Sequence, residues 1–230
     1  MYKLVFIWAA LLISVVTDGQ DMKELVMKVK AKLDQVTDYE ADGKMKTDVA
    51  FIKAPVGRVK VFYKKPNHFR LKKDGGISLL PKGGVSVNMS SVFSISDFVA
   101  LSAGDAVING IKTKVVKLLP MDENGDIILT TLYIDEPALL VMKSVTTTRN
   151  NGTYDIEMSY GKFGKYGLPD KVVFGFNTRD YKLPKGITLE FDDEEKPVSE
   201  AQKIKNRRGR VEIDYSNYVI NKGVPDAVFQ

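Results

Sequence analysis

Few residues in this chain of 230 could carry catalytic or metal-binding chemistry. It has no cysteine and one histidine, which excludes disulfides, thiolate sites, cysteine nucleophiles and metal sites built from several histidines. That histidine, His68, follows Lys65-Pro66-Asn67 on the polar side of a predicted strand, and no nucleophile motif accompanies it. We therefore interpret His68 as a solvated side chain and expect neither catalytic residues nor a metal or other cofactor.

Two charged segments also suggest chemistry. Asp122 to Asp126 resembles the start of a calcium loop, but Tyr133 stands where the glutamate at position twelve should be, so a hairpin turn is the better interpretation. Lys203 to Arg210 is strongly basic but lacks interleaved aromatic residues. We interpret it as a solvated stretch, with contact to an anionic membrane as a second possibility. The net charge of +5 is too small to indicate nucleic acid as a partner.

The N-terminus has the layout of a secretory signal peptide. Lys3 precedes an apolar run of 13 residues, Leu4 to Val16, and a short polar segment ends at Gln20. The run is too short for a comfortable membrane anchor, and a buried core helix is the alternative interpretation. We expect residues 1–20 to be removed by cleavage near Gly19 or Gln20, and the only tryptophan, Trp8, to leave with them.

The remaining chain, residues 21–230, is predicted to be a single, mainly β domain. Asp21 and Glu24 form a variant capping box, and apolar residues at helical spacing predict one amphipathic helix over residues 22–36. Alternating apolar and polar residues then predict about eleven strands between Tyr39 and Val219, including short ones at 77–80, 85–88 and 187–191. Asn-Gly pairs mark hairpins, and the absence of helical patterns between strands argues against a parallel sheet. We expect one large antiparallel barrel or curved sheet.

The alternation stops between Ser90 and Ile108. An apolar cluster, Val92 to Leu101, has Ser94 and Asp97 as caps and Gly104 as a stop, which predicts a short helix. Two interpretations of this helix remain open. It could plug the hollow face of a curved sheet, or it could simply complete the core.

Three segments resemble the LolA-like family of outer-membrane lipoprotein-sorting proteins. They are Val61 to Arg70, with its Lys-Pro-Asn-His-Phe-Arg stretch, Asp74 to Pro81, and the C-terminal Tyr215 to Phe229. The resemblance implies an incomplete antiparallel β-barrel closed by helices around an apolar cavity. It also implies a non-catalytic activity, which is to carry lipidated proteins across the periplasm from the inner to the outer membrane.

The resemblance further implies a monomer in the periplasm. Its partners would be acylated lipoproteins or lipids, an inner-membrane donor protein and an outer-membrane acceptor protein. A second function open to the same fold is that of an envelope sensor or regulator that binds lipids or lipoproteins. The chain departs from the family at Lys65, where carriers often have arginine, and it has no tryptophan between Val92 and Leu101. Either departure could mean different gating or a different cargo.

On this hypothesis the apolar faces of the strands line a cavity for acyl chains. Its predicted lining residues are Met45, Val49, Val61, Tyr63, Phe69, Leu71, Leu132, Met142, Met158, Phe174 and Phe176. Flexible methionine side chains suit a wall that must adapt to flexible chains. The predicted lid residues are Phe93, Ile95, Phe98 and Leu101, and the predicted polar gating residues are Lys65 and Arg70. For each lining residue, ordinary core packing is the alternative.

Overall fold

The computed structural model describes residues 19–48, 56–66, 68–74, 97–150, 152–177 and 208–229. One helix covers residues 19–33. Ten strands follow: β1 (Asp38–Asp48), β2 (Gly57–Lys64), β3 (His68–Lys73), β4 (Phe98–Ile108), β5 (Ile111–Pro120), β6 (Ile127–Asp135), β7 (Leu140–Thr148), β8 (Thr153–Ser159), β9 (Lys171–Asn177) and β10 (Arg208–Ile220). Two short 3₁₀ helices, η2 (Gly164–Tyr166) and η3 (Asp226–Phe229), complete the described elements.

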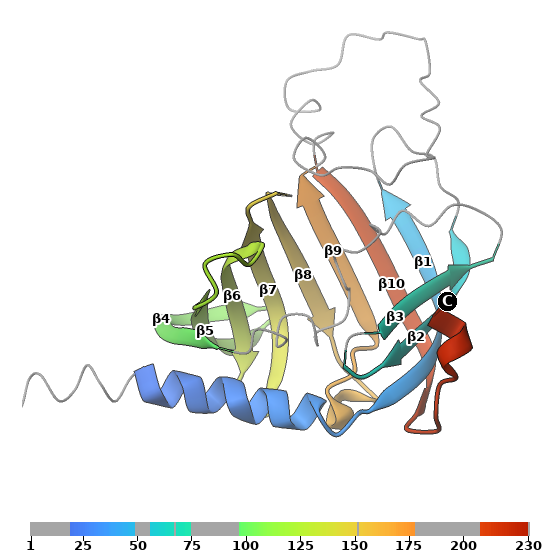
Figure 1. Cartoon of the computed structure of the whole chain (residues 1–230), viewed down its shortest axis with the longest axis horizontal. Helices are drawn as coiled ribbons and strands as arrows, with labels where there is room; N and C mark the ends of the chain where they lie inside the picture. The colour runs from blue at the N-terminus through green and yellow to red at the C-terminus, as the bar shows by residue number, and fades with distance from the viewer. Residues whose placement is uncertain are drawn as a thin grey trace, which may run out of the picture.

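All ten strands belong to one antiparallel sheet in the order β3-β2-β1-β10-β9-β8-β7-β6-β5-β4. Figure 1 shows this sheet bent into a trough, with the helix across its lower edge. The end strands β3 and β4 do not pair with each other, so within the described ranges the sheet is an incomplete barrel. This confirms the predicted fold class. The strands predicted at 77–80, 85–88 and 187–191 lie outside the described residues.

The N-terminal helix begins and ends earlier than predicted. It is already formed at residue 19, so Asp21 lies inside it rather than at its cap. It ends at residue 33, and Asn221 holds the turn that follows. The Asn221 side chain accepts the Thr37 backbone N–H at 2.8 Å and donates to the Gln35 carbonyl at 2.9 Å. Val36 is therefore buried beyond the helix rather than on its face.

The predicted lid helix is wrong for the part that the structure describes. Phe98 and Leu101 lie in strand β4, which pairs with β5 from Phe98 opposite Pro120 to Ile108 opposite Ile111. Gly104, predicted to stop a helix, has a φ of 85° and lies inside the register shift of β4. Phe93 and Ile95, the other predicted lid residues, lie outside the described residues.

The core is the inner face of the trough together with the apolar face of the helix. Met22, Leu25, Val26 and Val29 of the helix belong to the same buried cluster as side chains from most of the sheet, including Val116, Leu132, Ile156 and Phe174. A second cluster, built around Tyr39, Tyr63 and Tyr218, lies on β1, β2 and β10. Burial of these side chains provides most of the driving force that bends the sheet around its interior.

Candidate functional site

The inner face of the trough is a continuous wall of side chains, because register pairing places inward residues of successive strands side by side. One row runs from Val116 through Leu132, Ser144 and Ile156 to Phe174. The next row runs parallel to it and comprises Ile134, Val141, Met158, Val172, Ile213 and Met45. We call this surface the inner wall.

The inner wall is wider than one helix. Nine spacings between ten strands amount to roughly 43 Å at about 4.8 Å each. The helix over residues 19–33 is about 22 Å long and roughly 10 Å across. It lies across the lower edge of the sheet in Figure 1. The described helix therefore contacts only part of this apolar surface, and the wall has the extent that binding of long hydrocarbon chains requires.

Most of the predicted lining residues do come together on this wall. The first buried cluster contains Met45, Leu132, Met158, Phe174 and Phe176, with Phe69 and Leu71 packed against it, and the second contains Val61 and Tyr63. That these residues bind acyl chains stays a prediction.

Two predicted lining residues lie elsewhere. Val49 is outside the described residues. Met142 is buried but belongs to neither cluster. It is the additional residue at a bulge in β7, where Ile134 pairs with Val141 and Tyr133 pairs with Lys143.

The remaining lid residues have separate environments. Phe98 is buried, and the Nζ of Lys23 on the helix lies 5.9 Å from its ring centroid. Leu101 is 46% exposed, so it does not line the interior. Phe98 thus helps to hold the helix against β4, as a core residue does.

The two predicted gating residues connect the β2–β3 turn to other elements. Lys65 Nζ lies 2.9 Å from Asp34 Oδ1 and donates a hydrogen bond to the Asp34 carbonyl, just after the helix. Arg70 donates to the carbonyl of Val228 in η3 at 2.9 Å. Burial works to raise the pKa of Asp34, but hydrogen bonds from Lys30 and Lys65 outweigh it and hold the pKa below its ordinary value. Both cations therefore clamp the β2–β3 end of the sheet.

Aromatic residues fill the part of the wall next to this clamp. The rings of Tyr39 and Tyr63 lie 5.3 Å apart, and Tyr218 contacts Tyr39, Tyr215 and Phe163 at ring distances of 4.9 to 5.4 Å. The Tyr218 hydroxyl donates to the Pro169 carbonyl at 2.7 Å. Burial raises the pKa of Tyr39, Tyr215 and Tyr218, so these phenols stay neutral. This end is rigid and packed with rings.

Strand β7 contributes polar groups to the inner wall that sequence reasoning missed. Ser144 and Thr146 are each 1% exposed and face inward, whereas Val145 between them is only half-buried. Thr146 shares a hydrogen bond of 3.2 Å with Thr130 on β6. The alternation of β7 predicts which residues share a face but assigns serine and threonine to the wet side. The inner wall is thus apolar with a hydroxyl-bearing stripe.

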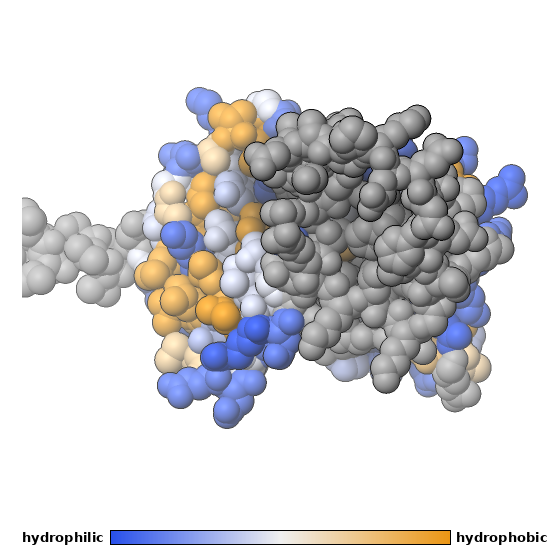
Figure 2. Space-filling view, turned by 90° about the horizontal axis from the view of Figure 1, so that it is seen from above, coloured by the Kyte–Doolittle hydropathy of each residue, from blue (hydrophilic) through white to orange (hydrophobic). Residues whose placement is uncertain are grey.

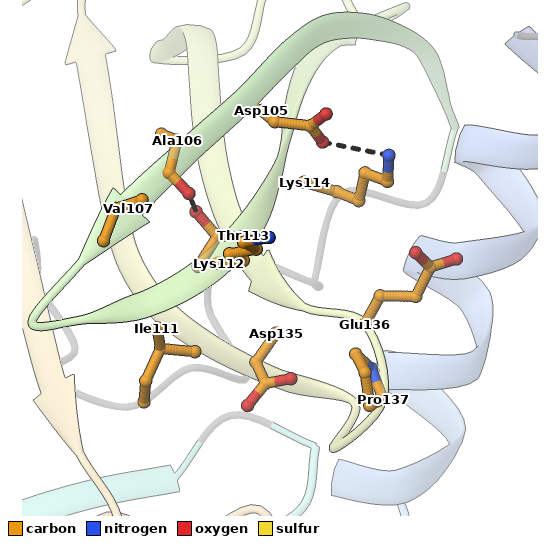
Figure 3. Close-up of a pocket in the computed structure, with 10 residues that line it drawn as sticks. All are labelled: Asp105, Ala106, Val107, Ile111, Lys112, Thr113, Lys114, Asp135, Glu136 and Pro137. Atoms are coloured by element: carbon orange, nitrogen blue, oxygen red, sulfur yellow. Dashed lines mark hydrogen bonds and ion pairs between the residues drawn. The ribbon is translucent and has the colours of Figure 1, made fainter.

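A described pocket lies away from these residues. It has a volume of about 660 Å³ and lies between the β4–β5 hairpin and the β6–β7 turn, with the helix alongside (Figure 3). Some of its polar groups pair with each other: Lys114 lies 2.9 Å from Asp105, and Thr113 donates to the Ala106 carbonyl. No predicted lining residue contributes to it. We therefore take the inner wall, and not this pocket, as the candidate site.

Exposed apolar side chains are present on the β4–β6 side of the molecule, where Figure 2 shows them among charged ones. They include Val99, Leu101, Leu119, Met121 and Ile128. They alternate with inward residues such as Phe98 and Ala100, so this edge of the sheet is apolar on both faces.

Two other candidates from the sequence, His68 and Asp122, make local contacts. His68 is exposed on β3 and its ring lies 5.4 Å from that of Phe229. Asp122 caps a turn by accepting the Asn124 backbone N–H at 2.9 Å. Within the described ranges, no three His, Asp or Glu side chains gather as a metal site would require. Over the same residues, no helix has the length and hydropathy needed to cross a bilayer.

No family model and no curated protein sequence matches this chain, but solved structures do. A DUF1329 family protein from Desulfovibrio piger superposes with a TM-score of 0.56 at 12% identity, over 93% of this chain and 97% of that one. An outer-membrane lipoprotein-sorting protein domain from Vibrio parahaemolyticus gives 0.55 at 13% identity, over 92% and 97%. The fold is LolA-like. A LolA superfamily protein from Nitrosomonas europaea also matches, with a TM-score of 0.49 at 12% identity, over 89% and 97%.

The first two likenesses show the fold that the sequence motifs predicted. At 12–13% identity they do not transfer an activity or a set of binding residues. Any function for this LolA-like chain has to be argued from its own inner wall.

Proposed function

We propose that this LolA-like protein is a periplasmic carrier, which binds the acyl chains of lipoproteins against its inner wall and delivers them toward the outer membrane. The observation that supports the proposal is the width of the apolar inner wall relative to the single described helix that packs on it. The fold shared with a domain named for lipoprotein sorting agrees with this function. The signal-peptide layout of residues 1–20 agrees with export.

The energetics favour binding without chemistry. Each buried CH₂ contributes about 0.8 kcal/mol, so a chain of sixteen carbons contributes about 12 kcal/mol before the costs of ordering and displacement. Affinity is therefore easily obtained, and release is the harder step. Transfer to an acceptor with a more apolar or less obstructed site is downhill, so delivery needs no nucleotide or catalytic residue.

The first test is native mass spectrometry of the mature protein purified from the periplasm under mild conditions. The proposal expects a co-purified mass that corresponds to a lipid or lipopeptide and is lost on extraction with organic solvent. Titration with a dansylated fatty acid then measures affinity, with unlabelled saturated fatty acids of increasing length as competitors. Each added CH₂ is expected to tighten binding about fourfold until the wall is filled. Affinity that does not depend on chain length would contradict the proposal.

A matched pair of variants tests whether the inner wall is the binding surface. Leu71→Gln places an amide on the inward side of the edge strand β3, where Leu71 is half-buried against the core. Lys72→Gln places the same amide one residue further, on the exposed side of that strand. We expect Leu71→Gln to weaken binding of the labelled fatty acid about fivefold and Lys72→Gln to leave it unchanged. Equal effects of the two variants would argue against the inner wall.

A further inference from the structure

The buried hydroxyl of Ser144 on the inner wall has no evident role in the fold. Strand β7 directs Ser144, Thr146 and Thr148 inward, and Thr146 lies opposite Thr130 of β6 whereas Ser144 lies between apolar residues. Ser144 pairs with Leu132 on one side and with Ile156 on the other. An alanine or valine there would continue the apolar wall. The sequence instead places a buried hydroxyl at its centre.

The hydroxyl of Ser144 has no hydrogen-bond partner, although the residue is only 1% exposed. Buried polar side-chain atoms nearly always have a partner, because an unpartnered one loses its hydration without compensation. Thr148, on the same stripe, does have one, since its Oγ1 donates to the Gly152 carbonyl at 3.0 Å. Ser144 is therefore the exception on β7.

The neighbouring hydroxyls hold a second unused donor. Thr130 and Thr146 share one hydrogen bond at 3.2 Å. Two hydroxyls carry two hydrogens, and the bond between them uses only one. One hydrogen remains to be donated elsewhere, about 7 Å along the strand from Ser144. The stripe therefore offers hydrogen-bond donors, and no charge, to whatever lies against it.

We propose that Ser144 donates a hydrogen bond to the carbonyl oxygen of an ester or amide at the head of a bound acyl chain, with the Thr130–Thr146 pair as the adjoining donor. This inference rests on the proposed acyl-chain carrier function and specifies the chemical class of the ligand. A neutral carbonyl matches the stripe because it accepts hydrogen bonds and costs less to bury than a carboxylate or phosphate. The flanking Leu132 and Ile156 would contact the hydrocarbon on either side of it.

The test compares two ligands that differ only in this carbonyl. One is a synthetic diacylated lipopeptide with ester-linked chains, and the other is its ether-linked analogue of equal chain length. Binding to the full mature protein is measured by displacement of the dansylated fatty acid. We expect the wild-type protein to prefer the ester about fivefold, as one hydrogen bond in a buried site implies. The variant Ser144→Ala should lose this preference while its affinity for the ether is unchanged.

Two controls separate recognition from folding. Thr147→Val removes a hydroxyl from the opposite face of the same strand, where Thr147 pairs with Thr153 at 3.0 Å, and should keep the preference. Ser144→Ala should be at least as stable as the wild type without ligand, because it removes an unpartnered buried group. A purely structural role for Ser144 predicts the reverse. A parallel pair of diester and diether phosphatidylglycerols shows whether the carbonyl belongs to a lipopeptide or to a phospholipid.

The outcomes distinguish the two proposals. If neither lipopeptide nor phospholipid binds the wild-type protein, the carrier function and this inference both fail. If the ligands bind but the ester and ether are indistinguishable, the inference fails and the carrier function stands. Retention of the ester preference in Ser144→Ala, or an equal loss of affinity for both ligands, would also overturn the role of Ser144.

Discussion

Gly209 on β10 allows the ring of Phe176 to lie flat against the sheet, and this contact gives a quantitative prediction. The two residues pair directly across β9 and β10. A Cβ added to Gly209 would lie 2.3 Å from the tip of the Phe176 ring, well inside any van der Waals contact. The ring also stacks on Phe174, with centroids 5.2 Å apart, so it cannot tilt freely in that direction. Gly209→Ala should therefore push the ring away from the sheet and into the interior.

The magnitude follows from two contributions. Overpacking of a filled core costs about 1–3 kcal/mol, whereas replacing glycine by alanine in a strand returns about 0.5–1 kcal/mol. Gly209→Ala should then destabilise the protein by about 0–2.5 kcal/mol, with a central value of about 1 kcal/mol. Phe176→Ala alone should cost about 3–5 kcal/mol, because Phe176 is almost fully buried. With the ring absent, the three closest contacts of the added methyl group disappear, and Gly209→Ala should become neutral or stabilising.

Urea unfolding followed by far-ultraviolet circular dichroism measures this double-mutant cycle. We expect a coupling free energy of about 2 kcal/mol between the two substitutions. As the control, Gly209→Ala is combined with Leu118→Ala on distant β5, where effects should add within about 0.5 kcal/mol. Additive effects of Gly209→Ala and Phe176→Ala would refute the claim that the absence of a side chain at Gly209 makes room for the Phe176 ring. Gly209→Ala should also weaken binding of the dansylated fatty acid, with recovery in the double variant.

Three other predictions follow from the described contacts. Asn221→Ala should lower the free energy of unfolding by about 2 kcal/mol, because it removes the hydrogen bonds to Thr37 and Gln35 and places alanine on a backbone with φ of 55°. Asn221→Gly relieves the backbone strain but not the loss of the hydrogen bonds, so it should recover only part of the lost stability in the same urea assay. Burial raises the folded-state pKa of five tyrosines, which are Tyr39, Tyr154, Tyr160, Tyr215 and Tyr218. The free energy of unfolding should therefore stay constant below pH ~10, the pKa of tyrosine in the unfolded chain, and fall as the pH rises toward the folded-state pKa values. In a pH titration, tyrosinate absorbance should appear together with loss of structure rather than before it. Export with cleavage near Gly19 or Gln20 should remove Trp8, so the secreted protein should show no tryptophan emission, and an emission maximum typical of tryptophan would contradict cleavage.

The alternation of residue types was enough to predict much of the sheet. In β1, Tyr39, Ala41 and Met45 are buried while Lys44 and Lys46 are exposed, as a period of two requires. The hairpin turns at Asn124-Gly125 and before Gly152 also lie where predicted, since these residues adopt turn conformations at little cost. Alternation and turns depend on residues that are close in the chain, so they can be predicted from the sequence.

Strand β4 shows where this reasoning fails. Val99 and Leu101 face outward at 43% and 46% exposure, so apolar residues occupy both faces and the period of two disappears from the hydropathy pattern. An apolar run without visible period is compatible with a buried helix or with a strand. Pairing with β5 makes this segment a strand, and that pairing cannot be predicted from the neighbouring residues in the chain.

The inner wall also combines features that the sequence predicts with features that depend on strand pairing. Sequence alone predicted a large antiparallel barrel or curved sheet with one apolar face, because alternation and turn residues are local properties, and the family resemblance alone implied that the barrel is incomplete. Only the tertiary structure decided that Met142 would become the extra residue of a bulge and that Ser144 would lie unpartnered between Leu132 and Ile156. The physical reason is that a side chain's surroundings in a sheet are set by strands paired across it, and the register of that pairing depends on the whole fold.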